Sequence, residues 1–198
     1  TMDASYTESV WWSFKELHAK GLVYEGFKSM QICPRCETTL SNFEVNQGYK
    51  DITDISVYVK FKMAGVRNVY ILAWTTTPWT LPGNAALAVR SDVLYAQVSI
   101  EGEEGEFILA KERLEAVLKG KVYKIVREFK GKEIVGMSYE PVFSYYKDAD
   151  IKNKENAWKI YSADFVTTED GSGVVHTAPS FGADDLLLAQ KENIFQKN

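Results

Sequence analysis

The chain has 198 residues, of which 45% are hydrophobic, and a formal net charge of −4. This length and composition suffice for one folded domain with a sizeable core and exclude an intrinsically disordered chain. The acidic balance excludes a globally basic nucleic-acid-binding protein, so any contact with nucleic acid must come from a local patch. No long apolar run and no signal-like N-terminus occur, which predicts a cytoplasmic location without a membrane partner.

The N-terminal region is predicted to contain one helix. Apolar side chains at Val10, Phe14 and Leu17 recur at helical spacing between residues 6 and 20. His18 falls on this helix and is interpreted as a structural residue.

A CxxC knuckle follows at Cys33 and Cys36, which is the spacing of half a zinc site. A structural zinc ion needs four ligands, and the chain has no other cysteine and no histidine pair to complete them. We therefore expect no bound metal and no cofactor, although a second ligand pair in a longer protein would complete such a site. Residues 1–40 are interpreted as a connecting segment with the helix and the knuckle, and residues 41–198 as the main domain.

Short β-type runs dominate the rest of the chain. Residues 55–63 largely alternate between apolar and polar side chains, whereas residues 69–74 are continuously apolar, as in a buried strand. Glycines and glutamates at residues 102–105 predict an acidic hairpin turn. Further strands are predicted at residues 85–89, 94–100, 107–109, 122–129 and 174–175, and short helices at residues 111–119 and 183–193. This pattern predicts an α+β, mainly β fold: a closed or nearly closed β-barrel core with peripheral helices.

The apolar run at residues 69–74 ends in a hydroxyl-rich loop with the sequence Trp74-Thr75-Thr76-Thr77-Pro78-Trp79-Thr80-Leu81-Pro82-Gly83-Asn84. Pro78 and Pro82 fix φ and are expected to hold Thr77 and Leu81 extended. A rigid loop of this kind presents several hydroxyls at once, as a binding wall does. The alternative is that the adjacent threonines fill a strand and bond nearby backbone.

A second candidate segment has the sequence Gly171-Ser172-Gly173-Val174-Val175-His176-Thr177-Ala178-Pro179-Ser180-Phe181-Gly182-Ala183-Asp184-Asp185. His176 is expected where a strand meets a turn, and its neutral imidazole can donate or accept a hydrogen bond. Asp184 and Asp185 are expected to open the last helix, where the helix dipole favours carboxylates. That favourable charge placement alone is the alternative explanation for both aspartates.

These two motifs resemble the threonine-rich signature and the Gly-x-Gly-x-Val-His-x-Ala-Pro…Asp-Asp element of the editing domain inserted into isoleucyl-tRNA synthetase. Residues 6–12 and 20–24 are similar to the synthetase segment that leads into the insertion, so the resemblance covers essentially the whole chain. Valyl and leucyl editing domains carry Thr-Thr-Arg-Pro in the first motif and lack the histidine, whereas this chain has Thr77 and His176. The His-Ile-Gly-His and Lys-Met-Ser-Lys-Ser signatures of class I synthetases do not occur, so no activation of amino acids is expected.

The resemblance implies a class I synthetase editing-domain fold and hydrolysis of the ester of mischarged valyl-tRNA(Ile), with water as the nucleophile. Asp185 would grip the α-ammonium group of the aminoacyl moiety. Thr76 and Thr77 would orient water or the carbonyl, and His176 and Asn84 would contact the ribose or complete the pocket. The candidate catalytic residues are Thr76, Thr77, His176 and Asp185, and the candidate substrate-binding residues are Thr75, Trp79, Thr80, Asn84, Asp184 and Asp185.

Selection between isoleucine and valine depends on a single methylene, and hydrolysis in a second, smaller pocket is the established answer to that weak discrimination. Valine must fit this pocket and isoleucine must clash with it, which requires a rigid wall. Trp79, between Pro78 and Pro82, is the candidate for part of that wall, with the ring of His176 opposite. The alternative is that Trp79 is a core aromatic residue.

The implied partners are the 3′ end of valyl-tRNA(Ile) and the synthetic domain of the same full-length enzyme, and the fragment itself is expected to be a monomer. Lysine and arginine are in excess between residues 111 and 132, which indicates either a solvated face or contact with tRNA phosphates. Two other functions stay open. One is a binding-only module for valine or valyl-adenosine, and the other is valyl-type editing of threonyl-tRNA.

Overall fold

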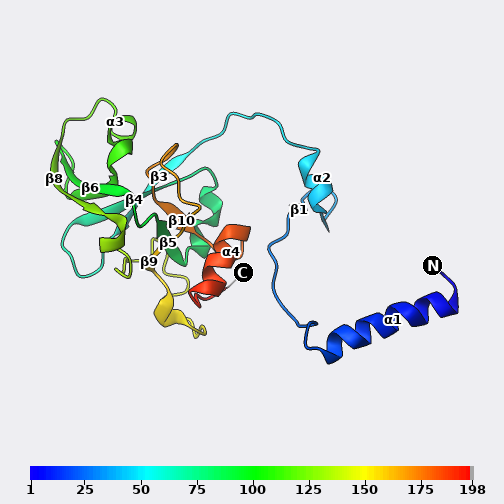
Figure 1. The fold of residues 1–198 in the computed structure, drawn as a ribbon. Coiled ribbons are helices and arrows are strands. Elements are labelled where there is room, and N and C mark those ends of the chain that lie inside the picture. The colour runs from blue at the N-terminus through cyan, green and yellow to red at the C-terminus, as the bar shows by residue number, and fades with distance from the viewer. Residues whose placement is uncertain (197–198) are drawn as a thin grey trace.

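The computed structural model describes residues 1–196, and its core is a curled β-sheet (Figure 1). The strands of this sheet are β3 (Val57–Lys62), β4 (Val69–Thr75), β5 (Ala86–Val89), β6 (Leu94–Ile100), β7 (Glu106–Ala110), β8 (Tyr123–Lys130), β9 (Lys159–Ser162) and β10 (Val175–Thr177). Their order is β8-β6-β7-β4-β10-β5-β9, and β3 pairs with β4. The predicted mainly β architecture is confirmed.

Two isolated β-bridges connect β9 to the end of β3 through residues 138–139. Met63, which follows β3, pairs with Tyr139, and Ser138 pairs with Lys159 of β9. The pairings therefore run from β3 through β4, β10, β5 and β9 and return to β3 through residues 138–139. The side chains enclosed by this ring form the largest apolar cluster, which includes Phe61, Ile71, Leu87, Tyr139, Ile160 and Val174.

Short helices surround the barrel. They are α3 (Leu114–Val117), α4 (Ala183–Lys191) and the 3₁₀ turns η1 (Pro78–Gly83), η2 (Lys111–Arg113), η3 (Gly131–Glu133) and η4 (Lys154–Asn156). Helix α3 buries Leu114 against a cluster with Phe107, and α4 buries Leu186 and Leu188. The predicted acidic hairpin turn is also confirmed, because β6 and β7 pair antiparallel on either side of it.

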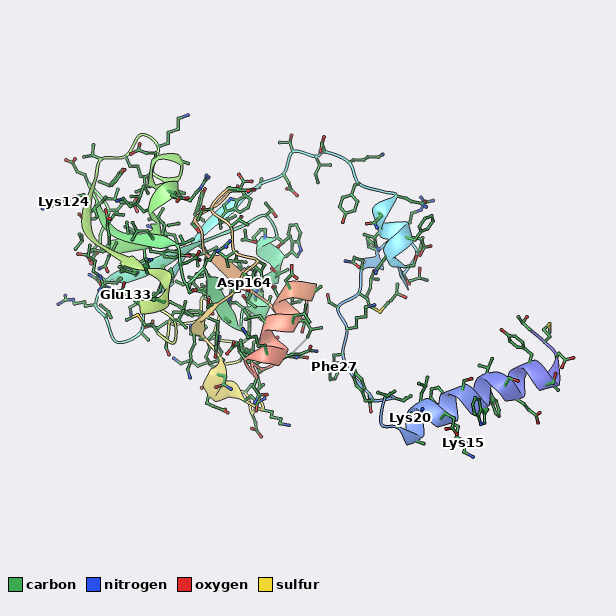
Figure 2. The ribbon with its side chains drawn as sticks, in the orientation of Figure 1. Lys15, Lys20, Phe27, Lys124, Glu133 and Asp164 are labelled. Carbon is green, nitrogen blue, oxygen red and sulfur yellow. The ribbon has the colours of Figure 1, made fainter. Side chains whose placement is uncertain are left out.

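The N-terminal region holds helix α1 (Ala4–Ala19), a hairpin of β1 (Ile32–Cys33) and β2 (Thr38–Thr39), and helix α2 (Asn42–Asn46). Helix α1 lies away from the barrel, at the end of an extended segment (Figures 1 and 2), and buries none of its residues. Its apolar side chains are exposed, which is typical of an interaction surface. Strand pairing in the main sheet begins at Val57. The predicted boundary at residue 40, between a connecting segment and the main domain, stays a prediction.

Two features of the sheet differ from the predicted strands. Strand β9 was not predicted, because its four residues, Lys159–Ser162, mix polar and apolar types and form no continuous apolar run. Strand β10 begins at Val175 and includes His176, which was expected at the mouth of the following turn. His176 therefore lies in a strand that pairs with β4 on one side and β5 on the other, and this pairing fixes the position of its backbone.

Candidate functional site

The two sequence motifs meet at strand β10. This strand pairs with β4, where Val175 lies opposite Trp74, and with β5, where His176 lies opposite Leu87. The hydroxyl of Ser172 donates to the carbonyl of Leu72 at 2.6 Å. Segments about a hundred residues apart in sequence thus form one site at the end of β4.

The threonine-rich loop is a compact turn. The hydroxyl of Thr75 accepts a hydrogen bond from the backbone N–H of Thr77 at 3.0 Å, just where β4 ends. Pro78 then opens η1, a position where the absent N–H of proline breaks no helical bond. The extended geometry predicted for Leu81 is wrong, because Leu81 is buried inside this 3₁₀ turn.

The turn separates the threonines into two groups. Thr75 and Thr80 are buried, whereas Thr76 and Thr77 are exposed. Trp79 also faces solvent, with 66% of its surface exposed, so the alternative of a core aromatic residue is wrong. The loop therefore presents two hydroxyls and one large aromatic ring at the surface.

His176 is buried, and both its ring nitrogens have partners. Its Nε2 lies 2.8 Å from the hydroxyl of Thr80, and its Nδ1 lies 3.2 Å from the amide nitrogen of Asn84. The Thr80 hydroxyl donates its own hydrogen to the carbonyl of Thr77 at 2.8 Å, so it must accept from His176. These partners assign a neutral imidazole with the proton on Nε2.

The electrostatics agree with that assignment. Burial lowers the pKa of His176 to about 4, so the ring is neutral at physiological pH. Since Nδ1 accepts from Asn84 and Nε2 donates to Thr80, neither nitrogen is left to bond a ribose in this arrangement. The geometry makes His176 a fixed part of the hydrogen-bonded framework that holds Thr80 and Asn84.

Asp185 is a half-buried carboxylate in the first turn of α4. Its Oδ2 accepts a hydrogen bond at 2.9 Å from the backbone N–H of Ala178, two residues after His176. Burial raises the pKa of Asp185 to about 6, and the nearby charge of Asp184 adds to the rise. Asp184 itself is exposed. Asp185 is thus ionised but poorly solvated at neutral pH, which favours binding of a cation.

The threonine-rich turn and the loop before α4 are in direct contact. A Cβ atom placed on Gly83 of η1 would lie only 2.7 Å from the ring of Phe181. Within the second loop, a Cβ on Gly182 would lie 3.0 Å from Oδ2 of Asp185. Glycine at these two positions allows the close approach that brings the loops together.

Two residues outside both motifs also hold the site. Arg113 donates to the carbonyls of Gly171 and Glu169 at 2.9 and 2.8 Å. Tyr139 donates to the side-chain oxygen of Asn84 at 2.6 Å. Neither residue is predictable as part of the site, because each lies far from the motifs in the chain and no local pattern marks it.

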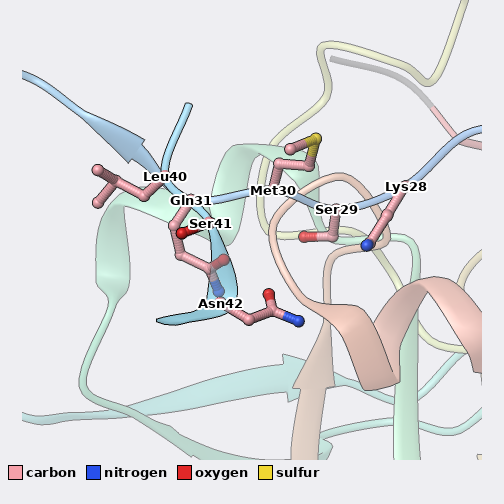
Figure 3. A pocket seen from close by; sticks show the side chains of 7 residues that line it. All are labelled: Lys28, Ser29, Met30, Gln31, Leu40, Ser41 and Asn42. Atoms are coloured by element: carbon pink, nitrogen blue, oxygen red, sulfur yellow. The ribbon is translucent and has the colours of Figure 1, made fainter. Parts of the chain in front are cut away.

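Two cavities involve the connecting segment. One, of about 250 Å³, lies between the residues before β1 and those after β2 (Figure 3) and takes no lining residue from the two motifs. The other, of about 490 Å³, lies between residues 27–32 and the loop and helix beside Asp185, including Pro179 and Leu186. The second cavity therefore lies next to the second motif, whose Pro179 and Ser180 line it.

The described part of the chain offers no group of three or more histidine, cysteine, aspartate or glutamate residues that could hold a metal ion. Cys33 and Cys36 are both free thiols. Within residues 1–196, none of the helices has the length and apolar character needed to cross a membrane.

The curled barrel with its peripheral helices is the fold of synthetase editing domains. The editing domain of the P. knowlesi cytosolic leucyl-tRNA synthetase matches it with a TM-score of 0.53 at 16% identity, over 74% of this chain and 66% of that one. At this identity the likeness defines the fold alone.

The chain belongs to the class I tRNA synthetases (I, L, M and V), whose family model matches residues 1–178. It is 46% identical over 194 residues to the isoleucine–tRNA ligase of Clostridium tetani and 47% identical over 194 residues to that of Clostridium novyi. In both comparisons 98% of this chain is covered, but only 18% of the relative. The resemblance to the isoleucyl-tRNA synthetase editing domain is confirmed.

Proposed function

We propose that this chain removes valine from mischarged valyl-tRNA(Ile) by hydrolysing the ester between the amino acid and the terminal ribose. The observation that carries the proposal is the direct contact between two loops. The loop before α4 leads into Asp185, a poorly solvated carboxylate, and the threonine-rich turn that it touches carries Thr76 and Thr77 at the surface. The partners are the 3′ end of the tRNA and the remaining body of a longer cytoplasmic synthetase. The chain spans 18% of the length of the Clostridium tetani relative.

Asp185 binds the α-ammonium group that every aminoacyl ester carries. An ammonium brought next to a carboxylate with a raised pKa restores the stabilisation that burial removed, and the pair forms a charge-assisted hydrogen bond. This contact leaves the amino-acid side chain untouched. Anchoring of the substrate and selection of its side chain are therefore separate tasks.

Water attacks the ester carbonyl, and Thr76 and Thr77 orient it or stabilise the oxyanion. A threonine nucleophile would need a general base, and His176 is a poor one: its pKa is about 4 and its acceptor nitrogen is held by Asn84. The carbonyl carbon gains the water oxygen, and the bond to the ribose oxygen breaks. One water proton passes to that ribose oxygen and the other to solvent, so valine leaves as its carboxylate and the tRNA leaves uncharged.

The pocket excludes isoleucine by size. Thr75, Thr80, Asn84 and His176 form a framework that hydrogen bonds make rigid, and Trp79 lies exposed on the same turn. A rigid wall rejects an added methylene by steric clash, whereas a soft one would adapt. Asp184 supports the site through its charge beside Asp185.

Hydrolysis of charged tRNA tests this function. We expect the chain to release valine from valyl-tRNA(Ile) at least about tenfold faster than isoleucine from isoleucyl-tRNA(Ile), because one excluded methylene is worth roughly that factor. Equal rates would contradict size exclusion. If the chain binds a non-hydrolysable valyl-adenosine analogue but cleaves neither ester, it is a binding module that needs the longer enzyme. Preferential loss of threonine would indicate valyl-type editing.

The pH dependence of hydrolysis is expected to follow Asp185. At pH above about 6 the free carboxyl is ionised and binds the ammonium; below it, kcat/KM should fall about tenfold for each pH unit. His176 stays neutral through this window, since its pKa is about 4. Initial rates at subsaturating substrate between about pH 5 and pH 8 provide the measurement. A profile that stays flat down to pH 5 would remove Asp185 from substrate binding.

A further inference from the structure

Tyr139 is a buried tyrosine at the seam of the barrel. Its backbone forms the bridge to Met63, and its N–H donates to the carbonyl of Trp158 at 2.9 Å. Its ring packs edge-on against Phe61, with ring centroids 5.3 Å apart. The backbone and the ring are therefore fixed, and the side chain is only 3% exposed.

The Tyr139 hydroxyl meets the side-chain amide of Asn84. It donates to Oδ1 of Asn84 at 2.6 Å, while Nδ2 of Asn84 donates to the carbonyl of Ala86 at 2.9 Å. The second hydrogen of Nδ2 then points to Nδ1 of His176 at 3.2 Å. Every polar atom of this buried amide has a partner, so its orientation is determined.

The donors of this network all point the same way. Tyr139 donates to Asn84, Asn84 donates to His176, and His176 donates through Nε2 to Thr80. Thr80 donates in turn to the carbonyl of Thr77, whose own hydroxyl lies at the surface. A chain of hydrogen bonds in one direction polarises each member and strengthens the next bond.

We propose that Tyr139 is a positioning residue of the editing site, whose hydroxyl fixes the Asn84 amide and thereby the His176 tautomer, the Thr80 hydroxyl and the Thr77 turn. This inference rests on the proposed function. Tyr139 touches neither the substrate nor water in the reaction; it acts through Asn84. If its hydroxyl is removed, Oδ1 of Asn84 loses its donor in a dry environment, and the amide is free to turn toward other partners.

The matched pair of variants is Tyr139→Phe and Tyr161→Phe. Phenylalanine keeps the ring contact with Phe61 and removes only the hydroxyl. Tyr161 is a partly buried tyrosine of β9 whose hydroxyl donates to the carbonyl of Asn156 at 2.7 Å, outside the network. Both substitutions remove one tyrosine hydrogen bond, but only the first reaches His176.

The first readout is the ¹⁵N NMR spectrum of the His176 ring. The wild-type chain and Tyr161→Phe should show the neutral tautomer protonated on Nε2, whereas Tyr139→Phe should show a second tautomer or exchange between the two. Retention of the Nε2-protonated tautomer in a folded Tyr139→Phe protein would overturn the proposal. This result is independent of catalysis, so it decides the role of Tyr139 even if the chain proves not to hydrolyse esters.

The second readout is hydrolysis of valyl-tRNA(Ile). Tyr139→Phe should lower kcat by about 10-fold, the effect of one displaced hydrogen bond at the site, with little change in KM because Asp185 still anchors the substrate. Tyr161→Phe should keep the wild-type rate. If Tyr139→Phe and Tyr161→Phe have equal rates while the wild type is active, Tyr139 is only a core residue. An inactive wild type would refute the proposed function separately.

Discussion

Replacing Asp185 with asparagine is expected to lower kcat/KM for valyl-tRNA(Ile) hydrolysis by about 100-fold, because a charge-assisted hydrogen bond to the substrate ammonium is lost. Asparagine keeps the side-chain oxygen that accepts from the N–H of Ala178, so the loop before α4 should keep its shape. Steady-state hydrolysis, with circular dichroism to verify folding, provides the measurement.

The same substitution should make the protein more stable at neutral pH. Burial raises the pKa of Asp185 to about 6 in the folded chain, above its ordinary value of 3.8, so ionisation opposes folding above pH 6. This penalty is fully present above the folded pKa and disappears as the pH falls from 6 towards 3.8. Asparagine cannot ionise, so we expect a gain of roughly 1 kcal/mol at pH 7 in urea unfolding, and none at pH below about 4.

Asp164→Asn is the matched control. Asp164 is exposed and lies outside both motifs, so its replacement should change neither the rate nor the stability measurably. A folded Asp185→Asn protein with wild-type activity would remove the carboxylate from the mechanism. A loss of activity together with a loss of stability would mean that Asp185 holds the fold and not the substrate.

The elements that sequence predicted correctly are those whose signal is local. Residues 69–74 form a continuous apolar run and become β4, and the glycines and glutamates of residues 102–105 become the turn between β6 and β7. The aspartates of the second motif open α4, as the helix dipole favours. In each case neighbours in sequence carry the information.

What could not be predicted depends on tertiary contacts. The environment of His176 depends on Asn84 and on Tyr139, which lies far from both in the chain. The turn at Leu81 was expected to be extended because of the following proline, yet packing of η1 against Phe181 outweighs that local preference. The exposure of Trp79 is set by the same turn. Contacts between residues far apart in the chain leave no repeating pattern of apolar and polar residues from which they could be predicted.

Replacing Gly173 with alanine is expected to destabilise the chain by roughly 2 to 4 kcal/mol, because a single methyl group there adds both backbone strain and overlap. Gly173 has φ of +72°, which an alanine adopts only with strain, and a Cβ there would overlap the Cβ of Ala110. The carbonyl of Gly173 also accepts from the buried Tyr95 hydroxyl at 2.7 Å, so the loop cannot easily move away. Urea unfolding measures the loss.

Two further variants separate the causes of this loss. Gly120→Ala has a similar φ of +78° and no atom within 4 Å of the new Cβ, so it should cost only about 1 kcal/mol, the backbone strain alone. Removing the obstructing methyl in an Ala110→Gly, Gly173→Ala double variant should recover part of the stability, a coupling that a double-mutant cycle detects. Because Gly173 lies three residues before His176, the single variant should also disturb the His176 tautomer. Equal costs at Gly173 and Gly120 would show that the second motif is not clamped against β7.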